Sequence, residues 1–418
     1  MTRSPQILSV RRQDELIARI LQERLTNILP VAMREAGIDM WLIICQEDDL
    51  DPVFKTMIPM NTWTPILQML VFFDRGEPEG IERINLSMTD TFDFYQTPWS
   101  GRRFEEQWQL LVKLIEERDP KRIGINTGKI NWAAGGLTHN LYQQLTSTLP
   151  SQYVARLVSA EAACERWLMT LSESELEFYP HLASIAHWMM AECFSPRFIA
   201  PGSTTTDDLE WAYWQMCTDL GLELSFKPYY RIFRSEIDQK LYGPDTKTIH
   251  RGDLVHCDVG IRYLRLCTDH QELAYVRREG EVDAPPGMRK LLAENNRMQK
   301  IYQGEFKENL TGNEILRNIL VKARESGIPN PKVYSHSLGI YLHEPGPLIG
   351  LPWEQESNPG RGDVRLRTNS CFTMELSVED RLPEWNDQLL RLPTEQDVKF
   401  TTQGCQPMDG VQTSFHLI

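Results

Sequence analysis

YSHSLGIYLHEP, residues 334–345, is the most specific stretch of this sequence. It places His336 and His343 seven positions apart with a glycine between them, a pattern that suits neither an amphipathic helix nor a regular strand. Imidazole is a common ligand of divalent metals, and a second imidazole nearby can donate a hydrogen bond to a carbonyl oxygen instead. Taken alone, the pair is equally consistent with two buried structural histidines.

Upstream of this stretch, two aspartates follow short apolar runs. Asp258 ends the run at 254–257, and Asp269 lies eleven positions later in a second run, so we expect an antiparallel pair of strands that brings the two carboxylates together. Aspartates near glycines also satisfy turns, so this pair alone is weak evidence of function. His256 and His270 flank the aspartates, and we expect them to point to the opposite strand face.

Downstream, two glutamates complete the set. Glu375 lies inside the apolar run 371–376, where an unpaired carboxylate would cost several kcal/mol and therefore needs a partner. Glu395 stands at the entry to a further predicted strand, with Asp397 as a rival for the same role. Gathered carboxylates repel one another and raise one another's pKa values, so a fold that collects them needs cations. We therefore expect a pair of divalent metal ions and a hydrolase whose nucleophile comes from water, with these ligands: Asp258, Asp269, His336, Glu375 and Glu395.

Composition limits the other classes of function. The 418 residues exceed one ordinary core, which favours two domains, and the net charge of -14 should repel nucleic acids and anionic membranes. The eight scattered cysteines form no CxxC pair, which is typical of reduced thiols in a cytoplasmic protein. No apolar run approaches the length of a membrane span, and the N-terminus lacks a secretory pattern. We expect a cytoplasmic protein with no membrane partner.

Hydrophobic periodicity outlines the elements. A helix over 16–29, interrupted at Pro30, should precede a strand at 40–45, with further strands at 69–73 and 122–125 and a helix at 104–115. Beyond residue 160, capping patterns at Ser172 and Thr205 open two helices, and two more are expected at 288–302 and 313–326. Mixed helices and strands predict the α/β (α+β) class, with a domain boundary between 154 and 172.

The order Asp, Asp, His, His, Glu, Glu resembles the pita-bread metallopeptidases, which include methionine aminopeptidase, Xaa-Pro aminopeptidase, prolidase and creatinase. Residues 335–344 are similar to the family's Gly-His-Gly-Ile-Gly-x-x-x-His-Glu signature, and Asp258-x-Gly260 with Asp269 matches its paired aspartates. The resemblance covers most of the chain. It implies a creatinase-type N-terminal α/β domain at 1–160 and a pita-bread catalytic domain, an antiparallel barrel-like sheet flanked by helices, at 161–418.

The resemblance also implies roles. Asp258 would chelate one ion, Asp269 and Glu395 would bridge both, and His336 and Glu375 would hold the other. His343 would face the substrate carbonyl, and Glu375 would shuttle a proton. The implied enzyme is a metallo-aminopeptidase that releases the N-terminal residue from peptides with proline in second position, with a hydroxide made at two metal ions as nucleophile. Manganese is the first choice for a set of mostly carboxylate ligands; cobalt, zinc and iron are alternatives.

Several positions depart from the family pattern. The family places an arginine and an aliphatic residue directly before the bridging Glu, whereas Pro393 and Thr394 precede Glu395 here. Aligning Glu395 costs a two-residue insertion, and the ungapped alignment puts Pro393, which cannot bind metal, at the ligand position. Two substrate-side histidines of the family correspond to Leu241 and Lys332.

These departures keep alternatives open. One is a prolidase acting on Xaa-Pro dipeptides, and another is a creatinase-like C–N hydrolase, which needs no metal. A third is a catalytically inactive pita-bread protein that only binds a ligand. The resemblance and the prevalence of symmetric pairs also predict a homodimer.

Overall fold

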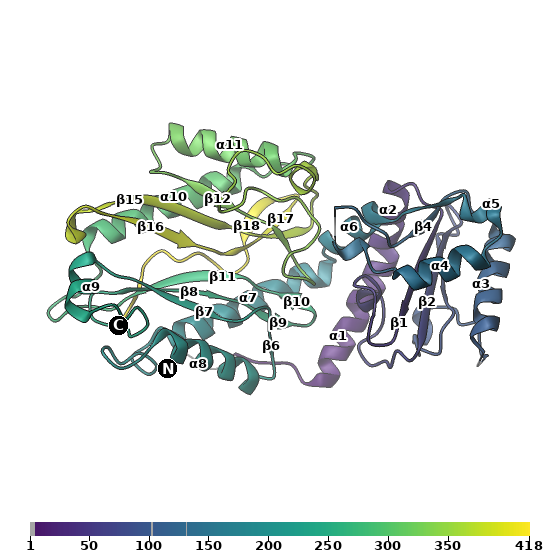
Figure 1. The fold of residues 1–418 in the computed structure, drawn as a ribbon, viewed down its shortest axis with the longest axis horizontal. Coiled ribbons are helices and arrows are strands. Elements are labelled where there is room, and N and C mark those ends of the chain that lie inside the picture. The colour runs from purple at the N-terminus through teal and green to yellow at the C-terminus, as the bar shows by residue number, and fades with distance from the viewer. Residues whose placement is uncertain (1–4, 102, 131) are drawn as a thin grey trace. The chain divides into compact units, whose positions relative to one another are not determined.

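The computed structural model describes residues 5–101, 103–130 and 132–418, and the chain divides into two compact units. The N-terminal unit is Leu8–Glu175, and the C-terminal unit is Leu176–Ile418 together with the segment before Leu8. Both contain helices and strands (Figure 1), which confirms the mixed α/β class. Helix α6 (Glu161–Met169) follows residue 160, the predicted end of the first domain, and packs against α2 (Leu29–Glu35) of the N-terminal unit.

The N-terminal unit is built on a five-stranded mixed sheet. Its strand order is β3-β2-β1-β4-β5, in which β1 pairs antiparallel with β2 and parallel with β4. The strands are β1 (Met40–Gln46), β2 (Leu67–Asp74), β3 (Ile81–Asn85), β4 (Ile123–Ile125) and β5 (Leu157–Ser159). The helices are α1 (Val10–Glu23), α2 (Leu29–Glu35), α3 (Phe104–Arg118), α4 (His139–Thr148), α5 (Ser151–Val154) and α6.

Strand β1 explains why helices cover both faces of this sheet. Six of its seven residues are buried, so both alternating sets of side chains are removed from water. Met40, Leu42 and Ile44 share one hydrophobic core with side chains of α3 and α4, which lie on one side of the sheet, while α1 and α2 lie on the other (Figure 1). Each fully buried aliphatic side chain contributes about 1.5–3 kcal/mol.

The first helical region departs from the prediction that Pro30 interrupts it. Helix α1 runs into a π-helical turn, Arg24–Ile28, which leads directly into α2. Pro30 lies in the first turn of α2, where a helical N–H has no obligatory intrahelical partner, so its ring is tolerated there. The expected break at Pro30 is therefore wrong, and helical backbone continues to Glu35.

The π-helical turn carries a buried arginine. Nη1 of Arg24 donates to Oε2 of Glu175 and to the carbonyl of Thr170, both at 2.8 Å, and Nη2 donates to the carbonyl of Trp167. Both charged side chains are almost fully buried. Glu175 also accepts the backbone N–H of Ser172 at 2.7 Å, so the capping pattern predicted at Ser172 is present.

The C-terminal unit consists of two successive groups of strands with their helices, entered through α7 (Glu173–Cys193). The first group comprises α8 (Thr206–Asp219), β6 (Glu223–Leu224), β7 (Tyr229–Phe233), α9 (Glu236–Tyr242), β8 (Leu254–Val259), β9 (Ile261–Tyr263), β10 (Leu266–Cys267) and β11 (His270–Tyr275). The second comprises α10 (Pro286–Glu305), α11 (Gly312–Glu325), β12 (Lys332–Tyr334), β13 (Ser337–Leu338), β14 (Ser370–Thr373), β15 (Glu375–Leu382), β16 (Gln388–Thr394), β17 (Asp397–Thr401), β18 (Gly404–Pro407) and β19 (His416–Leu417).

The strands of this unit form four small open sheets, ordered β10-β9-β6, β19-β11-β8-β7, β12-β15-β16 and β13-β14-β17-β18. Among the described residues they do not close into the barrel-like sheet that we expected. The ladders break between β10 and β11, β12 and β13, and β16 and β17, and these breaks contain Asp269, His336 and Glu395. Strand β19 of the second group pairs with β11 of the first, and an isolated bridge, Gln271 to Glu395, also links the two groups.

Helices α10 and α11 lie along the outer side of β15 and β16 (Figure 1). Their buried side chains, including Leu291, Leu292, Ile315 and Ile319, share a core cluster with strand residues such as Leu376. The helices thus shield the outer face of these strands from solvent, and the acidic residues lie on the inner faces. Their bounds confirm the helices predicted at 288–302 and 313–326.

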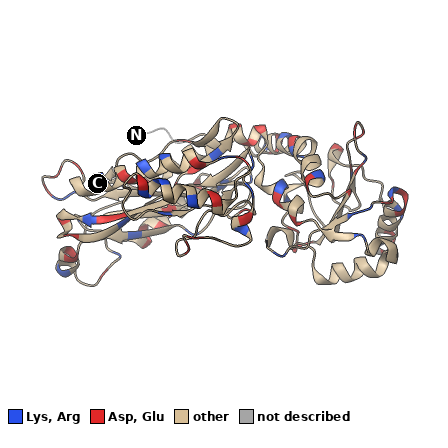
Figure 2. Ribbon diagram, turned by 90° about the horizontal axis from the view of Figure 1, so that it is seen from above, with Lys and Arg blue, Asp and Glu red and all other residues tan. Residues whose placement is uncertain are grey.

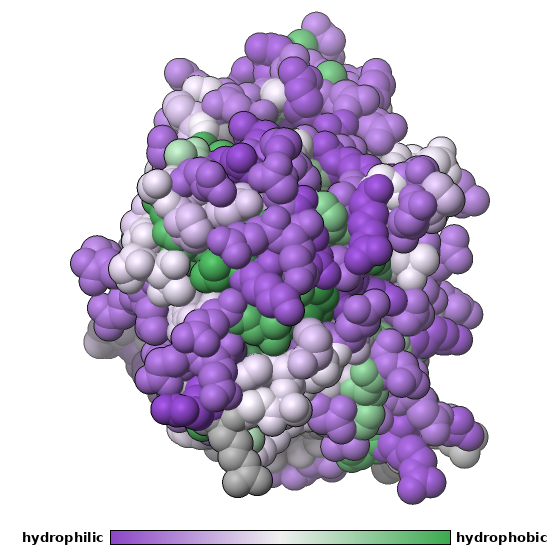
Figure 3. Space-filling model, turned by 90° about the vertical axis from the view of Figure 1, so that its right-hand side faces the viewer, coloured by the Kyte–Doolittle hydropathy of each residue, from purple (hydrophilic) through white to green (hydrophobic). Residues whose placement is uncertain are grey.

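The surface is mixed in character. Figure 2 shows acidic and basic residues interspersed along the helices and strands. On the face in Figure 3, hydrophilic residues cover most of the described surface, and apolar residues form small groups between them. Among described helices, none combines the length and apolarity that crossing a membrane requires. All eight cysteines are free and buried.

The Arg24–Glu175 pair generates a stability prediction. Replacing Arg24 with methionine should lower the free energy of unfolding of the N-terminal unit by about 3–5 kcal/mol, because it leaves a buried carboxylate without its partner. Chemical denaturation measures this loss. The matched control is Arg12→Met, whose partner Glu15 lies at 2.6 Å but whose side chain is 70% exposed, and it should cost less than about 1 kcal/mol. Equal losses in the two variants would contradict the prediction.

Candidate metal centre

A close crossing of the backbone places the two aspartates. Asp258 lies in β8 and Asp269 directly precedes β11, and these strands pair antiparallel as predicted, with Asp258 opposite Gln271. A Cβ atom at Gly260 would lie 2.1 Å from the carbonyl oxygen of Thr268, so only glycine allows the chain to cross there. The Asp-x-Gly pattern therefore serves to bring Asp269 back beside the strand that carries Asp258.

A carboxylate folds the histidine-rich stretch into a loop. Glu344 accepts the backbone N–H groups of Ile340 at 2.7 Å and Tyr341 at 3.2 Å. A Cβ atom at position 339 would lie 2.7 Å from the Glu344 carboxylate, which explains the glycine between the histidines. The resulting turn brings the ring of His343 to 4.3 Å from that of His336, measured between ring centroids.

The two glutamates reach the same region from adjacent strands of one sheet, β15 and β16. Glu375 begins β15, where it pairs with Tyr334 of β12. Glu395 follows β16, and its backbone bridges to Gln271 in both directions at 3.1 Å. The Gln271 side-chain amide also donates to Oε2 of Glu395 at 2.8 Å. Position 395 is therefore fixed against β11 and hence against Asp269.

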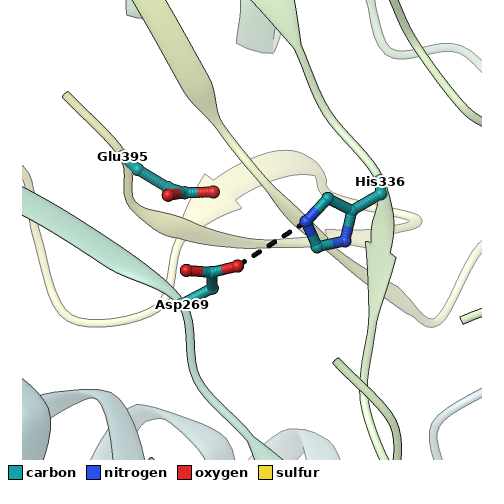
Figure 4. Close-up of side chains that lie close together, drawn as sticks. All are labelled: Asp269, His336 and Glu395. Atoms are coloured by element: carbon teal, nitrogen blue, oxygen red, sulfur yellow. Dashed lines mark ion pairs between the residues drawn. The ribbon is translucent and has the colours of Figure 1, made fainter. Parts of the chain in front are cut away.

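Three of the five expected ligands form one tight group. Asp269, His336 and Glu395 each offer an atom within 4.8 Å of the others, and all three side chains are buried. Nε2 of His336 lies 3.6 Å from Oδ2 of Asp269. Figure 4 shows these two side chains pointing toward each other from separate segments, with the Glu395 carboxylate beside Asp269.

Asp258 and Glu375 lie close enough to act on this group electrostatically, although they are not part of it. Burial raises the pKa of Asp269 well above its usual value, and the charges of Asp258 and Glu375 raise it further. Burial likewise raises the pKa of Glu395, with added repulsion from Asp269 and Glu375. Burial raises the pKa of Asp258 to about 6 and that of Glu375 to about 7. At neutral pH, four ionised carboxylates would therefore repel one another.

His336 is prepared to act as a ligand. Its Nδ1 lies 3.2 Å from the carbonyl oxygen of Ser337, which can only accept, so Nδ1 carries the hydrogen. The lone pair is then on Nε2, the nitrogen that faces Asp269. Burial lowers the pKa of His336 to about 3, which keeps the ring neutral. A neutral imidazole with a fixed tautomer is the form that binds metals.

The group fits divalent cations on its own chemistry. Oδ1 of Asp269 and Oε1 of Glu395 are buried without a hydrogen-bond partner. Buried polar atoms in native proteins are nearly always satisfied, and oxygen ligands with one imidazole suit manganese and related ions. A cation here would satisfy both oxygens and offset the repulsion between the carboxylates.

Asp397, the rival of Glu395, has a different environment. It lies in β17, buried, and its two carboxylate oxygens face the backbone N–H of Asp269 at 3.3 and 3.4 Å. Pro393, the residue of the ungapped alignment, pairs with Ser377 inside the β15–β16 ladder. The structure thus gathers Glu395 with Asp269 and His336, and sets Asp397 behind the Asp269 backbone.

A chain of hydrogen bonds that was not predicted from the sequence lies behind the carboxylates. Nε of Arg231 donates to Nδ1 of His256 at 3.2 Å, and Nε2 of His256 lies 2.9 Å from Oε1 of Gln271. Because Arg Nε can only donate, His256 must donate from Nε2, which leaves the Gln271 amide to donate to Glu395. The sequence could have indicated this, because His256 and Asp258 are two positions apart in one strand and such residues share a face.

That chain corrects the placement of His256. It was expected to point away from the aspartates, but residues 256 and 258 of β8 face the same side, and His256 is hydrogen-bonded to Gln271 on the site side. His270 is one residue from Asp269 and is buried near His187, with ring centroids 4.7 Å apart.

The two positions that replace family histidines differ in setting. Leu241 lies in α9 and is 69% exposed. Lys332 begins β12, and its Nζ donates to the carbonyl of Pro352 at 3.2 Å. Neither offers an imidazole, whereas His343 does and is accessible to solvent.

Comparison with known proteins agrees with this geometry. The model of metallopeptidase family M24 matches residues 180–410, more than half of the chain. A search of curated protein sequences found no match.

Solved structures share the fold over nearly the whole chain. An X-Pro aminopeptidase from Thermotoga maritima is 17% identical with a TM-score of 0.64, over 93% of this chain and 99% of its own. An Xaa-Pro dipeptidase from Bacillus anthracis is 17% identical with a TM-score of 0.61, over 95% and 100%. A prolidase from Pyrococcus furiosus is 16% identical with a TM-score of 0.55, over 91% and 98%.

The raised pKa values predict how metal affects stability. Acids with folded pKa values above their unfolded values of about 4 favour folding at low pH, and this contribution is lost as pH rises through the folded values of about 6 for Asp258 and about 7 for Glu375. Metal-free protein should therefore melt at a lower temperature at about pH 7.5 than at about pH 5. Added Mn²⁺ should raise the melting temperature more at the higher pH, because its ligands must be ionised. Equal increments at both pH values would contradict this.

The contrast between Glu395 and Asp397 gives a second prediction. Glu395→Gln should lower metal affinity by more than about 100-fold, because changes in residues that merely support a ligand already cost about 10–100-fold. Asp397→Asn keeps an acceptor for the Asp269 N–H and should have a smaller effect. Calorimetric titration with metal measures the affinity of both variants. A larger loss in Asp397→Asn would make that residue the ligand.

Proposed function

The chain belongs to metallopeptidase family M24, and on that premise we propose that it is a metal-dependent exopeptidase that releases the N-terminal residue from peptides with proline in second position. The observation that carries the proposal is the buried group of Asp269, His336 and Glu395, with Asp258 and Glu375 acting on it. Proteins of similar fold include an X-Pro aminopeptidase and an Xaa-Pro dipeptidase, which supports the choice of bond.

Five residues would hold two divalent ions: Asp258, Asp269, His336, Glu375 and Glu395. When bound, such ions supply a water of lowered pKa and a Lewis acid for the scissile carbonyl. We propose manganese first, because four of the five ligands are carboxylates; cobalt, zinc and iron are outcomes of metal analysis.

Glu375 is the proposed proton carrier. Its carboxylate lies close enough to Asp269 and Glu395 to raise the pKa values of both, so it is placed to accept a proton from the attacking water and deliver it to the leaving nitrogen. In an Xaa-Pro bond that nitrogen is tertiary and leaves only once protonated. Positioned proton transfer contributes about 100-fold to 10,000-fold in rate.

His343 is the proposed contact to the substrate carbonyl. Its ring lies beside that of His336, and its side chain is accessible, so a peptide can reach it. A hydrogen bond from this imidazole stabilises negative charge that develops on the carbonyl oxygen. We propose a peptide as the partner molecule; a homodimer and a cytoplasmic location stay predictions.

Metal content and peptide specificity test the proposal together. Protein purified without chelator should contain about two ions per chain, and Mn²⁺-loaded protein should release alanine from Ala-Pro-Ala but not from Ala-Ala-Ala. Chelator should abolish this activity and Mn²⁺ should restore it. A chain that binds no metal and cleaves neither peptide would instead be a binding protein with the same fold.

A further inference from the structure

A pocket of about 280 Å³ opens beside Glu375 in the C-terminal unit. Its polar lining is dominated by cations from three strands, although the chain as a whole carries a net charge of -14. The cations are Arg231 of β7, Lys332 of β12 and Arg391 of β16. Phe233, Leu376 and Pro393 add apolar surface. This combination suits an anionic group carried on an apolar body.

Strand register explains why the cations meet. Lys332 pairs with Ser377, and Ser377 pairs with Pro393, so these three form one row across β12, β15 and β16. Tyr334 and Glu375 form the next row on the same face, since each lies two residues along its strand. Arg231 approaches this face from β7. The pocket therefore continues the sheet face that carries Glu375.

The side chain of Arg231 is held in place by contacts other than ion pairs with carboxylates. Its Nε donates to His256, and its guanidinium lies 4.7 Å from the Phe233 ring centroid. In the described parts of the chain, Arg391 forms an ion pair with Glu379 at 3.1 Å, whereas Arg231 and Lys332 form none. Two of the three cations thus have no ion-pair partner among the described residues, and the acidic residue in the pocket lining is Glu375, the proposed proton carrier. A guanidinium fixed in this way is suited to binding a carboxylate.

We propose that this pocket is a subsite for a carboxylate of the peptide substrate, recognised by Arg231 and Lys332 with Arg391 at its edge. The inference rests on the proposed peptidase function and specifies its substrate class. Two residues along a strand span about 7 Å, so the Lys332 row lies about one to two peptide residues from Glu375. The carboxylate is then either the C-terminus of a very short peptide or an acidic side chain next to the proline.

Paired substrates test the subsite in the Mn²⁺-loaded protein. Ala-Pro is compared with Ala-Pro-amide, and Ala-Pro-Glu-amide with Ala-Pro-Gln-amide. We expect the carboxylate member of one pair to have a kcat/KM at least about 10-fold higher, since charge-assisted hydrogen bonds are worth that factor or more. A difference in the first pair identifies a terminal carboxylate, and a difference in the second pair identifies a side chain.

Variants connect the preference to the pocket. Lys332→Gln should reduce the preference to less than about threefold, mainly through KM, while Lys332→Arg should keep it. Arg381→Gln is the matched control: it removes one positive charge from β15, where Arg381 is exposed and outside the pocket lining, and should leave the preference unchanged. Equal kcat/KM within both pairs, or a preference that survives Lys332→Gln, overturns the proposal and leaves the cations as neutralising charges for the carboxylates.

Failure of the peptidase function itself is distinguishable. In that case no peptide of the four is cleaved, and binding of Ala-Pro and Ala-Pro-amide is measured by calorimetry with wild type and Lys332→Gln. Tighter binding of Ala-Pro by wild type alone supports the subsite. Equal binding of the two peptides overturns it.

Discussion

Repulsion among buried carboxylates is the constraint on which the C-terminal unit depends. Burial and mutual charge raise the pKa values of Asp269 and Glu395 far above those of free acids, and among the described residues the imidazole of His336, which burial keeps neutral, is the basic side chain within ion-pair distance of Asp269. A protein keeps such an arrangement only where a bound cation or a proton offsets it. The breaks in the sheets, the glycine crossing at Gly260 and the tautomer of His336 all serve to maintain this crowding.

Much of the site could be predicted because its signals are local. Glycines at 260 and 339 stand where a Cβ atom would collide with backbone or carboxylate. The sequence patterns around Asp258 and His336 therefore predict the local backbone geometry. The capping residues at 172 and 205 are equally local, and helices begin directly after them. The strands at 40–46 and 67–74 follow from their apolar runs.

What could not be predicted depends on contacts between distant segments. Gln271 looked unremarkable in sequence, yet it lies opposite Asp258 and donates to Glu395, 124 residues away. The pocket cations are 101 and 160 positions from Arg231 and meet only through strand register. Pro30 misled the prediction because a π-helical turn moved it into the first turn of a new helix.

The bridge between Gln271 and Glu395 has a consequence for the order of events during folding. The acidic group is shared between the first and second groups of strands, so neither group alone supplies all of its members. Complete coordination of a metal ion would therefore require that the two groups pack together first, unlike in small domains whose metal organises the chain. A newly made chain would therefore carry the crowded acids in protonated form until the two groups of strands have packed together, and a metal ion would then stabilise a structure that apolar packing has already assembled.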